Sequence, residues 1–156
     1  ISKKPLSTAG QLKTAEKFVN DAFVCVYGDS IFDFNLKNMI LEHKRKKSSV
    51  TMSLYNYKFE LKYGVIDTRK NGTITAWNEK PTINSKINMG CYIFDSEIFN
   101  FIPKNKQYGM DTVIKQIISK KKRVNSFVSK NTFIDIGSKE IYEETNRIYS
   151  KKNRRK

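Results

Sequence analysis

Two aspartates follow strand-like segments at points where a carboxylate could meet a ligand. Asp29 comes just after the apolar run 22–27, and Asp135 follows the segment 132–134. Ligands of open α/β sheets bind beyond the carboxyl ends of the strands. A pair of carboxylates there suits Mg²⁺, a hard ion that carboxylates hold together with substrate phosphates. The alternative is that both aspartates are ordinary turn residues that cap loops.

A second candidate is the tripeptide Glu79-Lys80-Pro81. Proline disfavours helical backbone in the residue before it, so we expect Lys80 to be extended and its ammonium group to point in one direction. Such a lysine is a point charge for a phosphate group, and Glu79 could accept hydrogen bonds from hydroxyl groups. An exposed charged turn is the alternative.

Two glycines and an asparagine near strand starts are weaker candidates. Gly64 and Gly90 each open a strand-like run, where a glycine can allow a ligand close to the backbone. Asn88 lies two residues before Gly90 and could contact the hydroxyl groups of a ligand. Sheet bends and a turn explain the same three residues equally well.

The cysteines and the histidine favour structural roles. Cys25 and Cys91 lie inside apolar runs, so we expect free buried thiols in a reducing cytoplasm. His43 is the only histidine and the cysteines form no close pair, which disfavours a zinc site. His43 lies in a helix-like stretch, and we expect it to pack against neighbours rather than to act in catalysis.

The elements that would position these residues alternate between helices and strands. We expect helices at residues 12–19, 36–43, 96–101, 110–118 and from 138 onward. We expect strands at 22–27, 49–54, 63–67, 73–77, 90–94, 124–128 and 132–134. We interpret residues 5–10 as a loop. The alternation favours an α/β fold with a mixed, mainly parallel sheet flanked by helices, and Asn71-Gly72 predicts an antiparallel hairpin.

The composition is that of one folded domain over residues 1–156. Hydrophobic residues make up 38% and aromatic residues 12% of the chain, which excludes a disordered chain. No apolar run approaches the ~20 residues that a bilayer-spanning helix needs, and the N-terminus has no signal-peptide pattern. We therefore expect a soluble, cytoplasmic protein with no membrane partner.

The formal net charge is +15, and thirteen basic residues fall in three clusters at 44–47, 120–123 and 151–156. One interpretation is a surface for polyanions. The other, which we favour here, is that cations decorate the ends of helices and the chain terminus. Nucleic-acid binding is further disfavoured because the aromatic residues lie mostly inside apolar runs, not among exposed cations.

Taken together, the motifs resemble those of the sugar-phosphate nucleotidylyltransferases, also called nucleoside-diphosphate-sugar pyrophosphorylases. The order and spacing match over nearly the whole chain. The matching segments are Pro5-Leu6-Ser7-Thr8-Ala9-Gly10, Gly28-Asp29, His43, Tyr63-Gly64-Val65, Glu79-Lys80-Pro81, Asn88-Met89-Gly90-Cys91-Tyr92 and Phe133-Ile134-Asp135-Ile136-Gly137-Ser138.

The resemblance implies a Rossmann-like domain with an antiparallel sugar-binding excursion. It implies a reaction that joins a sugar 1-phosphate to an NTP and releases pyrophosphate. By the resemblance, Asp29 and Asp135 would hold Mg²⁺ and Lys80 would bind the sugar phosphate, all three as catalytic residues. The implied sugar-binding residues are Gly64, Glu79 and Asn88, and the implied nucleotide-binding residues are Ser7, Thr8 and Gly10.

The segment at 5–10 is most similar to that of guanylyltransferases acting on mannose 1-phosphate or manno-heptose 1-phosphate, while thymidylyl and uridylyl transfer stay open. The family's glycine-rich triphosphate loop and its downstream Pro-Lys do not occur in this sequence. We therefore expect a domain that is incomplete at its N-terminus and inactive alone. The alternatives are a non-catalytic sugar-phosphate-binding or regulatory module and, further off, a basic nucleic-acid-binding protein. A homo-oligomer is left open.

Overall fold

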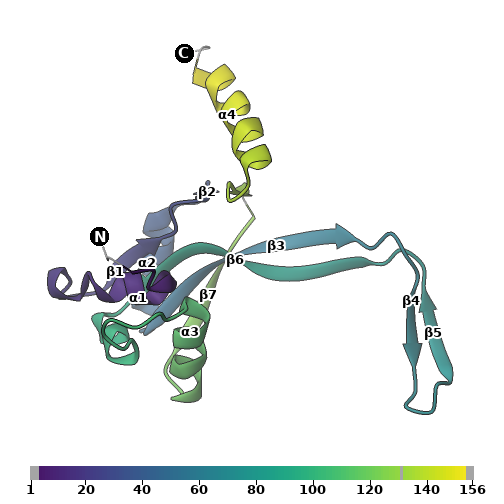
Figure 1. Ribbon diagram of the computed structural model, residues 1–156, viewed down its shortest axis with the longest axis horizontal. Coiled ribbons are helices and arrows are strands. Elements are labelled where there is room, and N and C mark those ends of the chain that lie inside the picture. The colour runs from purple at the N-terminus through teal and green to yellow at the C-terminus, as the bar shows by residue number, and fades with distance from the viewer. Residues whose placement is uncertain (1–3, 131, 154–156) are drawn as a thin grey trace.

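The central sheet has four strands in the order β1-β6-β3-β7 in the computed structural model, which describes residues 4–130 and 132–153 (Figure 1). The strands are β1 (Phe23–Val26), β3 (Val50–Glu60), β6 (Thr82–Phe94) and β7 (Val124–Ser129). β6 pairs antiparallel with both β1 and β3, and β7 pairs parallel with β3. Three of the four strands therefore run in one direction, which makes the sheet mixed and Rossmann-like.

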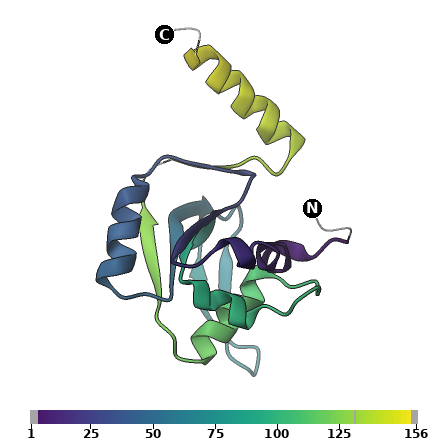
Figure 2. The ribbon, with the colours of Figure 1, turned by 90° about the vertical axis from the view of Figure 1, so that its left-hand side faces the viewer.

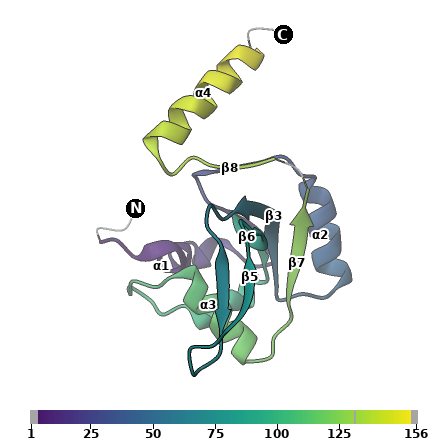
Figure 3. The ribbon, with the colours of Figure 1, turned by 90° about the vertical axis from the view of Figure 1, so that its right-hand side faces the viewer.

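Helices cover both faces of this sheet. On one face, Cys91 and Ile93 of β6 pack with Met39 of α2 (Leu36–Arg45). On the other face, the alternate residues Tyr92 and Phe94 pack in a larger core with helix α3 (Met110–Ser119) and the 3₁₀ helix η2 (Ser96–Phe101) (Figures 2 and 3). Successive side chains of a strand point to opposite faces, so burial on both sides explains the uninterrupted apolar run of β6.

The N-terminal segment differs from the expected loop and long helix. Helix α1 (Ser7–Lys13) begins inside the segment expected to be a loop, and a separate 3₁₀ helix η1 (Glu16–Phe18) replaces the second half of the expected helix. Phe18, expected on the buried face, is 76% exposed. The Tyr108 carbonyl accepts hydrogen bonds from the backbone N–H groups of Ala9 and Gly10, so long-range contacts fix the start of α1.

Strands β3 and β6 continue beyond the sheet as a long antiparallel arm, with register from Tyr55 opposite Ile87 to Glu60 opposite Thr82. At the end of the arm, β4 (Val65–Thr68) and β5 (Ile74–Asn78) form a hairpin on the far side of the molecule from α1 (Figure 1). Its turn contains Gly72 at φ +84°, which confirms the hairpin predicted from the Asn-Gly pair.

The last two elements lie outside the central sheet. β8 (Phe133–Asp135) pairs antiparallel with β2 (Ser30–Phe32), a short strand that the sequence pattern did not indicate. Helix α4 (Lys139–Asn153) stands away from the sheet in all three views (Figures 1–3). Ile141, Tyr142 and Ile148, which we expected on one apolar side of this helix, are therefore exposed.

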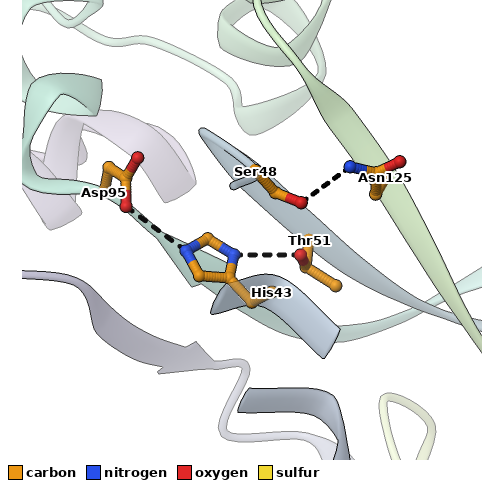
Figure 4. Close-up of polar contacts among 5 residues, drawn as sticks. All are labelled: His43, Ser48, Thr51, Asp95 and Asn125. Carbon is orange, nitrogen blue, oxygen red and sulfur yellow. Dashed lines mark hydrogen bonds and ion pairs between the residues drawn. The ribbon is translucent and has the colours of Figure 1, made fainter. Parts of the chain in front are cut away.

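His43 joins α2 to the sheet through two hydrogen bonds (Figure 4). Its Nδ1 lies 2.9 Å from Thr51 Oγ1 on β3, and its Nε2 lies 3.3 Å from Asp95 Oδ1 at the end of β6. Nearby, Asn125 Nδ2 donates to Ser48 Oγ at 2.6 Å, which links β7 to the end of α2. His43 is 3% exposed, so the expected packing role is confirmed.

Both cysteines are free thiols, as expected. Cys91 is fully buried, and burial raises its pKa to about 11, whereas Cys25 is half-buried. Among residues 4–130 and 132–153, every helix is too short or too polar to cross a lipid bilayer.

Candidate functional site

Two hollows of about 480 and about 510 Å³ adjoin where the first turn of α1 faces the carboxyl end of β1. Both are lined by Ser7, Thr8 and Tyr27, and we call them together the groove. The first hollow extends to Asn88 and the second to Asp29. The structure thus brings four residues predicted from the sequence to one groove: Ser7, Thr8, Asn88 and Asp29.

The start of α1 is held in place by the start of α3. Thr8 Oγ1 accepts a hydrogen bond of 3.0 Å from the backbone N–H of Met110, and Ser7 has a left-handed φ of +58°. Gly10 lies apart from these two residues. A Cβ there would lie 2.5 Å from the Lys106 carbonyl oxygen, so close backbone approach explains the glycine. Gly10 lines a separate hollow of about 160 Å³, and its nucleotide role stays a prediction.

A chain of hydrogen bonds runs along the groove. Asn88 Nδ2 donates to the Tyr92 hydroxyl, which donates to the Tyr27 hydroxyl at 3.2 Å. The Tyr27 hydroxyl accepts in this chain, so its own proton is available to a ligand. Burial raises the pKa of Tyr92, which keeps this hydroxyl protonated as a donor. Neither tyrosine was predicted as a site residue from the sequence. Each lies in an apolar run, where a hydroxyl group needs a hydrogen-bond partner, and this could have indicated a polar role.

Gly90 is required by the packing of this chain. Its φ is +73°, and a Cβ would lie 2.7 Å from Ser30 Oγ and 2.9 Å from Tyr27 Cδ2. Its carbonyl accepts a hydrogen bond of 2.8 Å from the Tyr27 N–H. The sequence left open whether a ligand or a bend of the sheet requires glycine at position 90. The atoms that lie close to Gly90 belong to the protein itself. The glycine sets the position of Tyr27 in the groove.

The two aspartates come from adjoining backbone segments. Asp29 lies directly before β2 and Asp135 ends β8, and Asp135 is opposite Ser30 in the β2–β8 pair. The Asp29 carbonyl accepts a hydrogen bond of 2.8 Å from the Ile136 N–H. A two-stranded antiparallel ribbon, rather than neighbouring parallel strands, thus brings these positions together.

The donor atoms at these positions suit Mg²⁺. Both carboxylates are exposed, and Asp135 Oδ1 accepts one hydrogen bond of 2.9 Å from the Gly137 N–H. Among the residues that the structure describes, there is no group of three or more histidine, cysteine or acidic side chains suited to a metal ion. Two carboxylates are nevertheless enough for Mg²⁺ when substrate phosphates supply further oxygen ligands.

Three other predicted residues lie away from the groove, on the β4–β5 hairpin and its exit (Figure 1). A Cβ on Gly64 would lie 2.9 Å from Glu79 Oε2, and Glu79 accepts a hydrogen bond of 3.0 Å from the Trp77 indole. Lys80 has φ +43°, so the expected extended conformation was wrong. Proline disfavours the right-handed helical region before it, and this left-handed backbone avoids that region.

The rim of the groove on α3 carries an ion pair. Lys115 Nζ lies 3.2 Å from Asp111 Oδ2, and both side chains are exposed. The hydrogen bond from Lys115 holds the pKa of Asp111 below its usual value. Apolar contact surface comes from Met52, Met110 and Ile114, so the groove offers apolar side chains beside polar groups.

The fold is an α/β domain with a groove at the carboxyl end of β1. The chain belongs to the nucleotidyl transferase family, whose model matches residues 1–152. A uridylyltransferase for UTP and glucose 1-phosphate from Synechocystis is 34% identical over 69% of this chain. The D-glycero-alpha-D-manno-heptose 1-phosphate guanylyltransferase of Campylobacter jejuni is 27% identical over 91% of it.

A solved structure has a similar fold. The crystal structure of HddC from Yersinia pseudotuberculosis matches 96% of this chain at 25% identity with a TM-score of 0.68. The chain spans only part of these proteins: 30% of the Synechocystis protein, 62% of the Campylobacter protein and 65% of the HddC chain. The similarity therefore establishes the family and the fold of the matched part.

Proposed function

We propose that this protein transfers a nucleotidyl group from an NTP to a sugar 1-phosphate, forming a nucleoside-diphosphate sugar and pyrophosphate. The observation that supports this most is the position of Asp29. It lines the same groove as Ser7 and Thr8, and its backbone is bonded to the segment that carries Asp135. In the reaction, an oxygen of the sugar phosphate attacks the α-phosphorus as the bond to pyrophosphate breaks.

The groove residues would bind and orient the substrates for this step. Ser7 and Thr8 would line the pocket for the base, and the Tyr27 hydroxyl would donate a hydrogen bond to a substrate oxygen. Asn88 would contact sugar hydroxyl groups from the same groove. Positioning of this kind, with neutralisation of charge, provides most of the catalysis in phosphoryl-type transfer.

Asp29 and Asp135 would hold Mg²⁺. When bound there, the ion would supply positive charge to phosphate oxygens. Glu79, Lys80 and Gly64 would contact the sugar phosphate only if the hairpin approaches the groove. We propose that approach as part of substrate binding.

The finer proposal is guanylyl transfer to mannose 1-phosphate or a related sugar. It is supported by the guanylyltransferases of Campylobacter jejuni and Aneurinibacillus thermoaerophilus, which align with 91% and 92% of this chain. The Synechocystis uridylyltransferase has a higher identity over a shorter segment, so UTP with glucose 1-phosphate is the main competitor.

The test is pyrophosphate release by the full-length gene product, with each NTP combined with mannose, manno-heptose or glucose 1-phosphate. We expect one pairing, with GTP, to exceed the others, and this chain alone to be inactive because no glycine-rich triphosphate loop occurs in its 156 residues. Tight binding of a sugar phosphate without turnover by the full-length protein would contradict the proposal and favour a regulatory module. Turnover with UTP only would contradict the finer proposal alone.

A further inference from the structure

Two of the basic clusters meet at one end of the sheet. We call them together the basic edge: residues 44–47 at the end of α2 and 120–123 at the end of α3. Arg123 Nη1 donates to the Lys46 carbonyl at 2.6 Å, and the Arg123 carbonyl accepts from the Ser49 N–H at 2.9 Å. Residues 77 positions apart in the sequence are thus in direct contact. The third cluster, at 151–156, lies outside the side chains that the structure describes.

The basic edge lies at the opposite end of the sheet from the groove. It precedes the first residues of β3 and β7, whereas Asp29 follows the last residues of β1. Since β1, β3 and β7 run in the same direction, these are opposite ends. A partner on the basic edge would therefore leave the groove open.

Most cations of the basic edge are unpaired. Glu42 pairs with Lys46 and Glu97 pairs with Lys122, each at 2.7 Å. Among the residues that the structure describes, no hydrogen bond or ion pair engages the side chains of five others, which are all exposed. These are Lys44, Arg45, Lys47, Lys120 and Lys121. Clustered like charges repel one another unless a polyanion neutralises them.

The backbone adds a second observation. Both helices end in the same way, with a lysine in the left-handed region: Lys47 at φ +47° and Lys121 at φ +56°. Glycine is the usual residue at this position after a helix because a side chain is strained there. Helix-dipole stabilisation needs a cation near the helix end but does not need one at this strained position. The dipole therefore explains these two lysines less well than a binding role.

We propose that the basic edge binds the surface of an anionic lipid bilayer. Six of its eight cations are lysines, which bind headgroup phosphates as point charges without the fork geometry of arginine. Exposed aliphatic side chains flank them, Leu41 on α2 and Ile118 on α3. Neither helix carries an aromatic residue that could stack on a nucleic-acid base.

This proposal revises the expectation of no membrane partner. That expectation rested on the absence of a spanning segment, and the two clusters taken separately were best explained as helix-end cations. Their convergence requires the β3–β7 pairing, which joins segments far apart in the sequence. Surface binding needs no spanning helix.

The test is cosedimentation of the full-length protein with phosphatidylcholine vesicles, with and without phosphatidylglycerol. We expect binding only with phosphatidylglycerol, weakened by salt. The double variant Lys47→Gly/Lys121→Gly removes two cations while relieving both left-handed positions, so it should unfold no more readily than the wild type. Each lost cation should weaken binding about fivefold.

The matched control is Lys58→Gln/Lys62→Gln, which removes the same charge from exposed positions on the arm and in the loop after β3. We expect vesicle binding of this variant to stay near that of the wild type. Absence of binding to anionic vesicles, or equal weakening by both double variants, would overturn the proposal. Binding to duplex RNA or DNA that the glycine variant abolishes, without vesicle binding, would overturn it in favour of nucleic acid.

Discussion

At the residue scale, the groove depends on a chain of hydrogen-bonded side chains in which the Tyr92 hydroxyl is buried. The chain from Asn88 through Tyr92 to Tyr27 orients one donor toward the groove. Burial keeps the Tyr92 hydroxyl neutral by raising its pKa. Tyr92 therefore stays a hydrogen-bond donor to Tyr27 near neutral pH.

Replacement of Tyr92 by phenylalanine should destabilise the protein, because the hydroxyl takes part in two hydrogen bonds. We expect Tyr92→Phe to lower the free energy of unfolding by about 1 kcal/mol. Tyr142→Phe on the exposed side of α4 is the control, and we expect it to have little effect. Urea unfolding measures both, and equal effects would contradict the role given to Tyr92.

Cys91 gives a prediction in alkaline solution. Burial raises its pKa from 9.0 to about 11, so the unfolded chain releases the thiol proton at lower pH than the folded protein does. Folding stability should therefore fall as the pH rises from 9 to 11. Urea unfolding across this range should show a shallower fall for Cys91→Ala. The same pH dependence in both proteins would contradict the assignment.

At the element scale, close contacts at two glycines position the groove. Strand β6 at Gly90 fits against the side chains of Tyr27 and Ser30, and the loop before α3 fits against Gly10. The strand pattern predicted the buried part of β6, because burial on both faces requires an uninterrupted apolar run. The bulge in the β3–β6 register between Met52 and Leu54 was not predictable, since it depends on the packing of several elements.

Two glycines with left-handed backbone separate conformational strain from crowding. Gly72 has φ +84° and open space where a Cβ would lie, whereas Gly90 has φ +73° and close neighbours. We expect Gly72→Ala to cost about 1 kcal/mol from the backbone alone. Gly90→Ala should cost about 3 kcal/mol, because overpacking adds to the strain. Denaturant unfolding measures the free energy of unfolding of both variants. An equal loss in the two variants would contradict the added effect of crowding at Gly90.

At the scale of the whole molecule, local patterns predicted elements better than their arrangement. Alternation of helices and strands indicated the α/β class, and the Asn-Gly turn indicated the hairpin. The proximity of the backbone at Asp29 and Asp135 comes instead from β2, which is too short to give a sequence signal. The separation of Glu79 from the groove likewise follows from the length of the arm. β3 continues past residue 54, its predicted end, and β6 begins at Thr82, before its predicted start at residue 90.

The proposed sugar-phosphate contacts require the hairpin to approach the groove. Spin labels on Gln11→Cys and Ile74→Cys, in a background without the native cysteines, would report the distance between α1 and the hairpin. We expect this distance to shorten when a sugar phosphate and a nucleotide are added together. An unchanged distance with bound ligand would exclude Glu79 and Lys80 from the sugar site.

We propose above all that Asp29 and Asp135 act together on one divalent cation. The most direct measurement is nucleotide-sugar formation by the full-length gene product as Mg²⁺ is titrated, comparing Asp29→Asn, Asp135→Asn and the exposed control Asp21→Asn. Each of the first two changes should lower the rate about 100-fold or more and shift the Mg²⁺ dependence to higher concentration, while Asp21→Asn should match the wild type. Wild-type rates and Mg²⁺ dependence for Asp135→Asn would contradict the claim.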